Sequence, residues 1–312
     1  MATLLCIGEI LVEMVAADVD QSISEPGRWV GPFPSGAPAI LADQAALCGV
    51  GVSLVGTVGA DAFGEACLAR LRSSGVAVDR VRVDANGTTG VAFVRYRGDG
   101  SRTFVFHLAE SASGRFRLSD LASGLLGVDG VHLMGSSLFS SAAVEAVDEV
   151  FDAARARGIP VSFDPNIRPE MLRREYVPTL QRIVRGAQVV LASEGELQPL
   201  LGEVSDEDCA RQLLAGSATM VVLKRGARGA GLYLPGHELS VPGLSVDEID
   251  PTGAGDCFGG TFLSLVMQGW EPEEAVRYAN VAGALAVTQR GPMSGNRSLR
   301  DLRAAEQALS ST

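Results

Sequence analysis

The feature that most constrains this chain is the alternation of short apolar runs with longer segments of helical periodicity. The apolar runs occupy 4–12, 52–59, 130–135, 159–166, 187–193 and 219–226. Between them, apolar residues recur at helical spacing in 38–49, 61–75, 140–158 and 271–290. Strands that are hydrophobic along their whole length are typical of a parallel sheet covered on both faces. The alternation therefore predicts an α/β fold with a doubly wound, mostly parallel sheet flanked by helices, in a single domain over 1–312.

One region breaks this alternation. The stretch VAFVRYRGDGSRTFVFHLA (91–109) has the pattern of two strands joined by a Gly-Asp-Gly turn, and RWVGPFPSG (28–36) is a second β-like patch. Together they predict a small β-sheet lid whose strands are inserted at about 10–35 and 90–110. Inserted elements of this kind commonly cover active sites, although a surface hairpin without a role is the alternative.

Charge and cysteine usage exclude several classes of protein. The formal net charge of −11 disfavours nonspecific binding to nucleic acid or to an anionic membrane. The five cysteines are dispersed without a CxxC pair, which favours reduced cytoplasmic thiols over disulfides or a zinc site. Glu9 and Glu13 interrupt the apolar N-terminus, so we interpret it as a strand rather than a signal peptide. The sequence contains no uncharged apolar run of about 20 residues, so we expect no membrane span.

The stretch DPTGAGDCFGGTF (250–262) carries the clearest chemical signal. The Gly-Ala-Gly turn at 253–255 leads into a helix that we expect to begin near Asp256. The free amides of a helix's first turn, with the helix dipole behind them, form an anion site. Asp256 either stabilises the helix dipole or is a general base beside an anion hole. Gly259 and Gly260 cost roughly 1 kcal/mol each in a helix, and close helix packing would offset that cost.

This stretch resembles the C-terminal signature of the ribokinase-like (PfkB) family of carbohydrate kinases. The resemblance is closest to fructokinase, 2-keto-3-deoxygluconate kinase and tagatose kinase-like members. Further stretches fall in the family's order and spacing: GEILVEM near the start, SGAPAILADQAALCG (35–49), VGTVGADAFGE (56–65), SFDPNIRPEML (162–172), SEGEL (193–197) and LKRGARGA (223–230). The resemblance covers nearly the whole chain. It implies a ribokinase-like fold and ATP-dependent phosphorylation of a sugar, with Mg²⁺ as cofactor.

The resemblance also implies roles for individual residues around the nucleotide. Asp256 is expected to be the catalytic base, and Gly253, Ala254 and Gly255 the anion hole. Glu196 matches the acidic end of the family's N-x-x-E element, which organises magnesium and phosphates through water, and Ser193 stands where that element has Asn. The other residues expected beside the nucleotide are Lys224, Gly226, Gly229 and Asn280. For Asn280 the alternative is a solvent-facing polar residue.

On the sugar side, the family's F-D-P-N-x-R element is filled by Asp164, Asn166 and Arg168. It follows a strand, so its polar groups are expected at the carboxyl edge of the sheet, where ligands of α/β proteins bind. Arg168 either clamps a carboxylate or phosphate or fixes its loop through a salt bridge. The residues expected to bind substrate are Glu13, Gly36, His107, Asp164, Arg168 and Asp256. For His107, a polar surface residue is the alternative.

Two departures from the family pattern bear on the substrate. Ile40 replaces an Asn that hydrogen-bonds sugar hydroxyls, and Leu108 stands where the keto-acid kinases carry an Arg. A pocket without that cation favours a neutral ketose, fructose-like or tagatose-like, phosphorylated on a primary hydroxyl. The first alternative is 2-keto-3-deoxygluconate. A nucleoside kinase of the same fold and a catalytically silent sensor are more distant alternatives.

Two further expectations concern a cation and a partner. The resemblance allows a monovalent cation such as K⁺ near 250–252 and the 287–295 loop. Sheet edges left open by a lid commonly pair with a second copy, so we expect a homodimer that forms through the lid.

Overall fold

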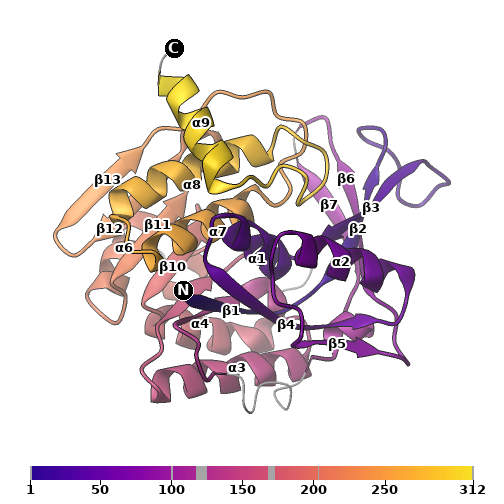
Figure 1. Cartoon of the computed structure of the whole chain (residues 1–312), viewed down its shortest axis with the longest axis horizontal. Coiled ribbons are helices and arrows are strands. Elements are labelled where there is room, and N and C mark those ends of the chain that lie inside the picture. Colours follow the sequence, from indigo (N-terminus) through magenta and orange to yellow (C-terminus); the bar gives the residue numbers. More distant parts are fainter. Residues whose placement is uncertain (1, 100, 117–124, 168–172, 203, 311–312) are drawn as a thin grey trace.

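A nine-stranded sheet runs through the middle of the molecule in the computed structural model, which describes residues 2–99, 101–116, 125–167, 173–202 and 204–310 (Figure 1). The strand order is β13-β12-β11-β10-β9-β8-β1-β4-β5. The strands are β1 (Thr3–Ile7), β4 (Gly51–Gly59), β5 (Val81–Asp84), β8 (Gly130–Met134), β9 (Val161–Asp164), β10 (Val189–Ser193), β11 (Met220–Lys224), β12 (Ala230–Leu234) and β13 (His237–Val241). From β11 to β5 every pair is parallel, and β12 and β13 add an antiparallel edge. The predicted fold class is confirmed.

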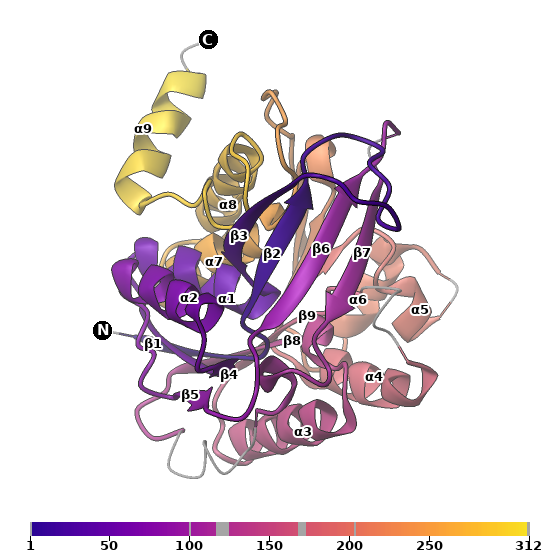
Figure 2. The ribbon, with the colours of Figure 1, turned by 90° about the vertical axis from the view of Figure 1, so that its right-hand side faces the viewer.

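Helices cover both faces of this sheet, as Figures 1 and 2 show. One face carries α1 (Ala37–Leu47), α2 (Ala62–Ser73), α7 (Ala254–Met267) and α8 (Pro272–Ala286), with α9 (Leu299–Ser310) against α8. The other face carries α3 (Ser141–Ala156), α4 (Val177–Gly186), α5 (Gln198–Leu201) and α6 (Asp206–Leu214). Each face buries its own apolar core, which is why the central strands are hydrophobic along their whole length. Among the described residues, no helix combines the length and apolarity needed to cross a membrane.

A separate small sheet stands against one side of the large one (Figure 2). Its order is β3-β2-β6-β7, with β3 (Trp29–Ser35), β2 (Leu11–Ala16), β6 (Gly90–Tyr96) and β7 (Arg102–His107). The pair β2–β6 is parallel, and the outer pairs are antiparallel. We refer to these four strands as the lid.

The apolar run 4–12, predicted as one strand, contains parts of two strands in different sheets. β1 ends at Ile7 in the large sheet, and β2 begins at Leu11 in the lid. Gly8 makes the bend with φ of 148°, and a Cβ at this position would lie 2.1 Å from the Oγ of Ser137. The prediction of one continuous strand is therefore wrong, because a single glycine redirects the chain between two apolar segments.

The glycines inside α7 allow the close packing that was expected of them. A Cβ at Gly260 would lie 2.5 Å from the carbonyl oxygen of Leu41 in α1, and one at Gly259 would lie 3.2 Å from the Cδ1 of Leu41. The backbone of α7 therefore sits directly on α1, which offsets the helix-propensity cost of both glycines. The helix begins at Ala254, two residues before the expected start at Asp256.

Candidate active site

The start of α7 presents backbone amides without acceptors inside the helix. Gly253 precedes the helix in the left-handed region, with φ of 80°, and a Cβ there would lie 2.6 Å from the carbonyl oxygen of Pro292. This turn therefore requires glycine. The amides of 254–256 occupy the first helical turn, where the helix itself supplies no acceptor, so they are available to a bound anion. The side chain of Ile40 packs against Gly253, so the residue that replaces the family's Asn covers this turn.

Asp256 is held in place by Asn166, from the loop after β9. The Asn166 Nδ2 donates a hydrogen bond of 2.9 Å to the Asp256 Oδ1, and both residues are buried. Asn166 has φ of 39°, and its Oδ1 has no partner among the described residues. A buried acceptor without a partner costs about 1–3 kcal/mol, so this oxygen is suited to accept from a ligand hydroxyl. The sequence analysis quoted Asn166 in its motif but assigned it no role.

Lys224 brings a positive charge to the anion site. Its Nζ lies 2.5 Å from the Oδ2 of Asp164, which is fully buried, and a Cβ at Gly255 would lie 3.4 Å from the same Nζ. Burial lowers the pKa of Lys224, but the carboxylates of Asp164, Glu196 and Asp256 outweigh it, so the net shift is upward. The ammonium group therefore stays charged beside the anion hole. Asp164 was expected to bind substrate, but it is buried against Lys224 and is not among the residues that line either of the two cavities described next.

A cavity of about 800 Å³ opens on one side of this centre. Of the residues expected beside the nucleotide, it is lined by Ser193, Lys224, Gly226, Gly229, Ala254, Gly255 and Asn280. Asn280 is 8% exposed, and its Nδ2 donates a hydrogen bond of 2.7 Å to the carbonyl oxygen of Pro242. It is therefore a wall residue of the cavity rather than a solvent-facing one. We call this space the nucleotide-side cavity.

A second cavity, of about 50 Å³, lies on the other side of the start of α7, and we call it the sugar-side cavity. The large domain contributes Glu9, Gly36, Ile40, Asn166, Gly253 and Asp256, and the lid contributes Glu13, Arg102, Phe104, Phe106 and Leu108. Glu13 is buried, and its Oε2 accepts a hydrogen bond of 2.8 Å from the Ser35 Oγ. Arg102, which the sequence analysis missed, is the sole cation that lines this cavity among the described residues.

Glu9 forms part of the floor of the sugar-side cavity and is buried. Its carboxylate accepts hydrogen bonds of 2.9 Å from the Ser136 Oγ and 2.6 Å from the Ser137 Oγ. Burial raises the pKa of Glu9, and these hydrogen bonds only partly oppose the shift.

Glu196 connects two strand ends beside Lys224. Its Oε1 accepts a hydrogen bond of 3.0 Å from the Ile167 amide, and its Oε2 accepts one of 2.7 Å from the Ser193 amide. The carboxylate thus joins the loops after β9 and β10, next to the nucleotide-side cavity. Among the described residues, no group of three or more His, Cys, Asp or Glu side chains could hold a metal ion.

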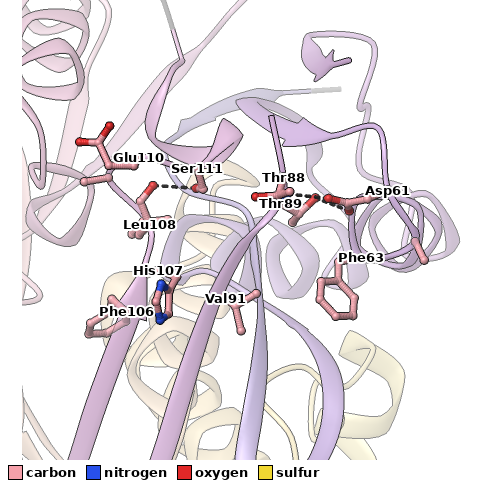
Figure 3. Close-up of a pocket in the computed structure, with 12 residues that line it drawn as sticks. Asp61, Phe63, Thr88, Thr89, Val91, Phe106, His107, Leu108, Glu110 and Ser111 are labelled. Carbon is pink, nitrogen blue, oxygen red and sulfur yellow. Dashed lines mark hydrogen bonds between the residues drawn. The ribbon is translucent and has the colours of Figure 1, made fainter. Parts of the chain in front are cut away.

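Besides Asp164, a second residue expected to bind substrate, His107, does not line the sugar-side cavity. His107 is exposed and lines a different cavity, of about 780 Å³, at the outer side of the lid. Figure 3 shows Val91 between His107 and Phe63 there. On β7, Arg102 and Phe104 line the sugar-side cavity and His107 does not, as strand alternation predicts, while Phe106 lines both cavities. Arg168 lies outside the described residues.

Comparison with known proteins places this geometry in a family. The model of the pfkB family carbohydrate kinases matches residues 1–299. Fructokinase-1 of Oryza sativa subsp. japonica is 33% identical, with 91% of each chain covered. The 2-dehydro-3-deoxygluconokinase of Thermoproteus tenax is 32% identical, with 99% of this chain and 94% of the relative covered.

Solved structures agree with this placement. A protein from E. coli described as a ribokinase II, solved with ATP and Mg²⁺, has a TM-score of 0.93 and 38% identity, covering 99% of this chain and 100% of that one. A fructokinase from Vibrio cholerae O395, solved with fructose, ADP and calcium, has a TM-score of 0.85 and 30% identity, covering 97% and 98%. The family model over residues 1–299 and these relatives show that the chain belongs to the pfkB family of carbohydrate kinases.

Proposed function

We propose that this protein transfers the γ-phosphate of ATP to a primary hydroxyl of a neutral ketose, fructose-like or tagatose-like. One observation carries the proposal: the start of α7 separates the two cavities. Gly253 and Asp256 line the sugar-side cavity, while Ala254 and Gly255 line the nucleotide-side cavity. A phosphoryl group bound by the first-turn amides would therefore lie between its donor and its acceptor.

The nucleotide-side cavity fits ATP. Its volume suits a nucleotide, and Lys224 with the α7 amides offers positive charge where the phosphates would lie. Mg²⁺ bound to these phosphates, with Glu196 and Ser193 behind its waters, would neutralise their charge. Asn280 and Gly229 would border the base and sugar of the nucleotide.

Asp256 is placed to act as the base. It would take the proton from the sugar hydroxyl while that oxygen bonds to the γ-phosphorus. The bond from phosphorus to the bridging oxygen breaks, and ADP leaves with the electron pair. The amides of 254–256 receive the charge on the transferred group. Asn166 orients the carboxylate through its hydrogen bond to Oδ1.

The charges of the sugar-side cavity favour a neutral substrate. Glu9, Glu13 and Asp256 line it, and Arg102 is the one opposing charge among the described residues. Leu108 is buried in the position where an acid-sugar kinase would carry an arginine. The second candidate is phosphorylation of 2-keto-3-deoxygluconate, which the Thermoproteus relative and Arg168 in the F-D-P-N-x-R element favour.

A coupled ADP-release assay with MgATP tests the function. Fructose, tagatose, 2-keto-3-deoxygluconate, ribose and a nucleoside would be compared, with Asp256→Asn as the inactive variant and Asp247→Asn, exposed nearby, as the matched control. We expect turnover on a neutral ketose and a loss of kcat of about 10²–10⁴-fold in Asp256→Asn alone. Preference for the keto-deoxy acid would replace the ketose with the second candidate. ATP binding without turnover on any sugar would contradict the kinase assignment.

The two segments expected to bind a monovalent cation lie together beside the start of α7. The Asp250 carboxylate accepts hydrogen bonds from the Thr252 amide, at 2.9 Å, and the Gly291 amide, at 2.8 Å, so the 250–252 and 287–295 segments lie together. We propose that carbonyl oxygens of these segments bind K⁺. A several-fold higher kcat in KCl than in an equal concentration of tetramethylammonium chloride supports this site, and equal rates contradict it.

A second copy of the chain is the proposed partner of the lid. Trp29, Phe93 and His107 form a row of aromatic rings on it, with centroids 5.0 Å and 6.3 Å apart, and Val105 is 39% exposed. β7 is also an open sheet edge, which is a template for pairing. Light scattering should show a homodimer that Val105→Glu weakens. A monomer at micromolar concentration would contradict it.

The proposed site of action is the cytoplasm. All five cysteines are buried free thiols, which suits a reducing compartment. Fractionation of the native host would test this assignment.

A further inference from the structure

Arg102 stands where the two cavities meet. It is the first residue of β7, and it lines both the sugar-side and the nucleotide-side cavity. Phe104 and Phe106 follow it at alternate positions of β7, Leu108 comes just after the strand, and all three also line the sugar-side cavity. Its side chain therefore lies where the two cavities meet, and a phosphoryl group transferred from nucleotide to sugar would pass this point.

The Arg102 guanidinium has no hydrogen bond or ion pair with any other residue in the described part of the chain. Its recorded contact is with the ring of Phe104, whose centroid lies 5.8 Å from Cζ. A guanidinium offers five N–H donors and no acceptor. A half-buried arginine facing two ligand cavities with all its donors unused is suited to an anionic ligand.

The lid holds Arg102 over the anion site. Tyr96 pairs with Arg102 across β6 and β7, and its hydroxyl hydrogen-bonds to the carboxylate of Asp250 and, at 2.7 Å, to the Thr252 Oγ1. Asp250 and Thr252 directly precede Gly253. This end of the lid hairpin is therefore anchored to the segment that leads into the anion hole.

The position of Arg102 along β7 indicates which anion it meets. Leu108, where an acid-sugar kinase would place its carboxylate-binding arginine, lies six residues further on, about 20 Å along an extended strand. Arg102, at the other end of β7, also lines the nucleotide-side cavity, which Leu108 does not. The anion that passes this point is the γ-phosphoryl group, whose oxygens match the planar fork of a guanidinium.

We propose that Arg102 is a catalytic residue supplied by the lid, and that its guanidinium binds the γ-phosphoryl oxygens during transfer. The inference rests on the proposed function. The bond changes are those given above: the acceptor oxygen bonds to phosphorus, its proton goes to Asp256, and ADP leaves with the electrons of the broken bond. Arg102 exchanges no proton. It adds hydrogen bonds that strengthen as the lid closes over the migrating group.

Steady-state kinetics of Arg102→Ala and Arg102→Lys test the proposal, with Arg97→Ala on the same hairpin as control. Arg97 is exposed, and its recorded side-chain contact is with Thr103. We expect kcat to fall by about 10²–10³-fold in Arg102→Ala, with the KM for sugar changed less than about threefold. Arg102→Lys should recover part of the rate, and millimolar guanidinium should partly rescue Arg102→Ala. Arg97→Ala should match the wild type.

Binding measurements separate this proposal from the proposed function. Wild type should bind MgADP with aluminium fluoride, which mimics the transferring group, more tightly than MgADP alone, and Arg102→Ala should lose that gain. This comparison remains informative even if no sugar is turned over, a result that would overturn the proposed function alone. An unchanged kcat in Arg102→Ala, a raised sugar KM at constant kcat, or equal gain from aluminium fluoride in both proteins would overturn the role of Arg102.

Discussion

The two cavities meet at the start of α7 but are built differently. The nucleotide-side cavity has about 800 Å³, and most of its wall comes from the large domain, including β11 and α8. The sugar-side cavity has about 50 Å³, and the lid forms its roof. A space of that size admits a few water molecules and no hexose. In this structure the nucleotide-side cavity is therefore large enough for a nucleotide, whereas the sugar-side cavity would have to widen at the lid to admit a hexose.

Removing the buried partner of Lys224 should have the largest effect, and it should act on the nucleotide-side cavity. Asp164→Asn leaves the Lys224 ammonium buried without its ion pair, and we expect a loss of about 3–5 kcal/mol in the free energy of unfolding. Nucleotide affinity should fall as well. Urea unfolding and ADP titration check both effects. Glu207→Gln, which breaks the more exposed pair with Arg225, should cost less than about 1 kcal/mol. Equal costs in the two variants would contradict a specially built donor site.

Changing the roof should instead alter which acceptor is used. Leu108→Arg places a cation above the sugar-side cavity, where Leu108 is now buried. We expect the ratio of kcat/KM for 2-keto-3-deoxygluconate to that for fructose to rise about 10–100-fold, because a charge-assisted hydrogen bond contributes about 1.5–3 kcal/mol. The KM for ATP should stay constant. Leu108→Met, of similar volume, should keep the ratio of the wild type. A shift confined to ATP would contradict the separation of the two sites.

Loosening the attachment of the lid should weaken sugar binding but not nucleotide binding. Tyr96→Phe removes the hydroxyl that bonds to Asp250 and Thr252. Burial and the Asp250 charge raise the pKa of Tyr96, so its hydroxyl stays protonated and keeps donating at physiological pH. We expect the sugar KM to rise roughly tenfold while the affinity for ADP stays the same. Tyr278→Phe, distant on α8, is the control. If ADP affinity falls as much as sugar affinity, the lid is not specific to the acceptor.

The smallest expected effect is a pH dependence from the floor of the sugar-side cavity. Burial raises the pKa of Glu9 above its ordinary 4.5, so the folded protein binds this proton more tightly than the unfolded chain. Stability is therefore lost as pH rises from about 4.5 through the folded pKa. Glu9→Gln removes this loss, so its free energy of unfolding should rise relative to that of the wild type between pH 4.5 and pH 8. Urea unfolding at several pH values measures it. Glu145→Gln, exposed on α3, should show no such trend, and a parallel trend in both would refute the assignment to Glu9.

The sequence predicts the large sheet well because strands buried on both faces are apolar throughout. The run 4–12 misleads for the same reason: β1 and β2 are both apolar, and only Gly8 marks the bend. In the site, the glycine turn and Asp256 follow from local chemistry. The hydrogen bond from Asn166 joins residues 90 positions apart, so only the fold creates it.

The lid shows a second limit of sequence reading. Its hairpin is visible in the pattern of alternating residues, but which face of β7 meets the cavity depends on how the two sheets pack. A histidine is the more usual candidate for binding or catalysis, yet Arg102 is the residue that lines both the sugar-side and the nucleotide-side cavity. The polarity of the side chains alone therefore does not identify which residues of β7 line the sugar-side cavity.

The close packing of α7 on α1 has a consequence for the distance between the two cavities. That distance depends on the contact between the helices at Gly260, which lines neither cavity. α1 begins after Gly36, which lines the sugar-side cavity, and α7 begins at Ala254, which lines the nucleotide-side cavity, while Gly260 lies about 9 Å further along α7. A side chain at 260 would act as a wedge and tilt the helix start. Its signature would be slow turnover with normal ligand affinities. Random mutagenesis would therefore identify Gly260 as a position needed for turnover although it touches no ligand. Directed evolution toward new substrates would have to conserve the contact between α1 and α7.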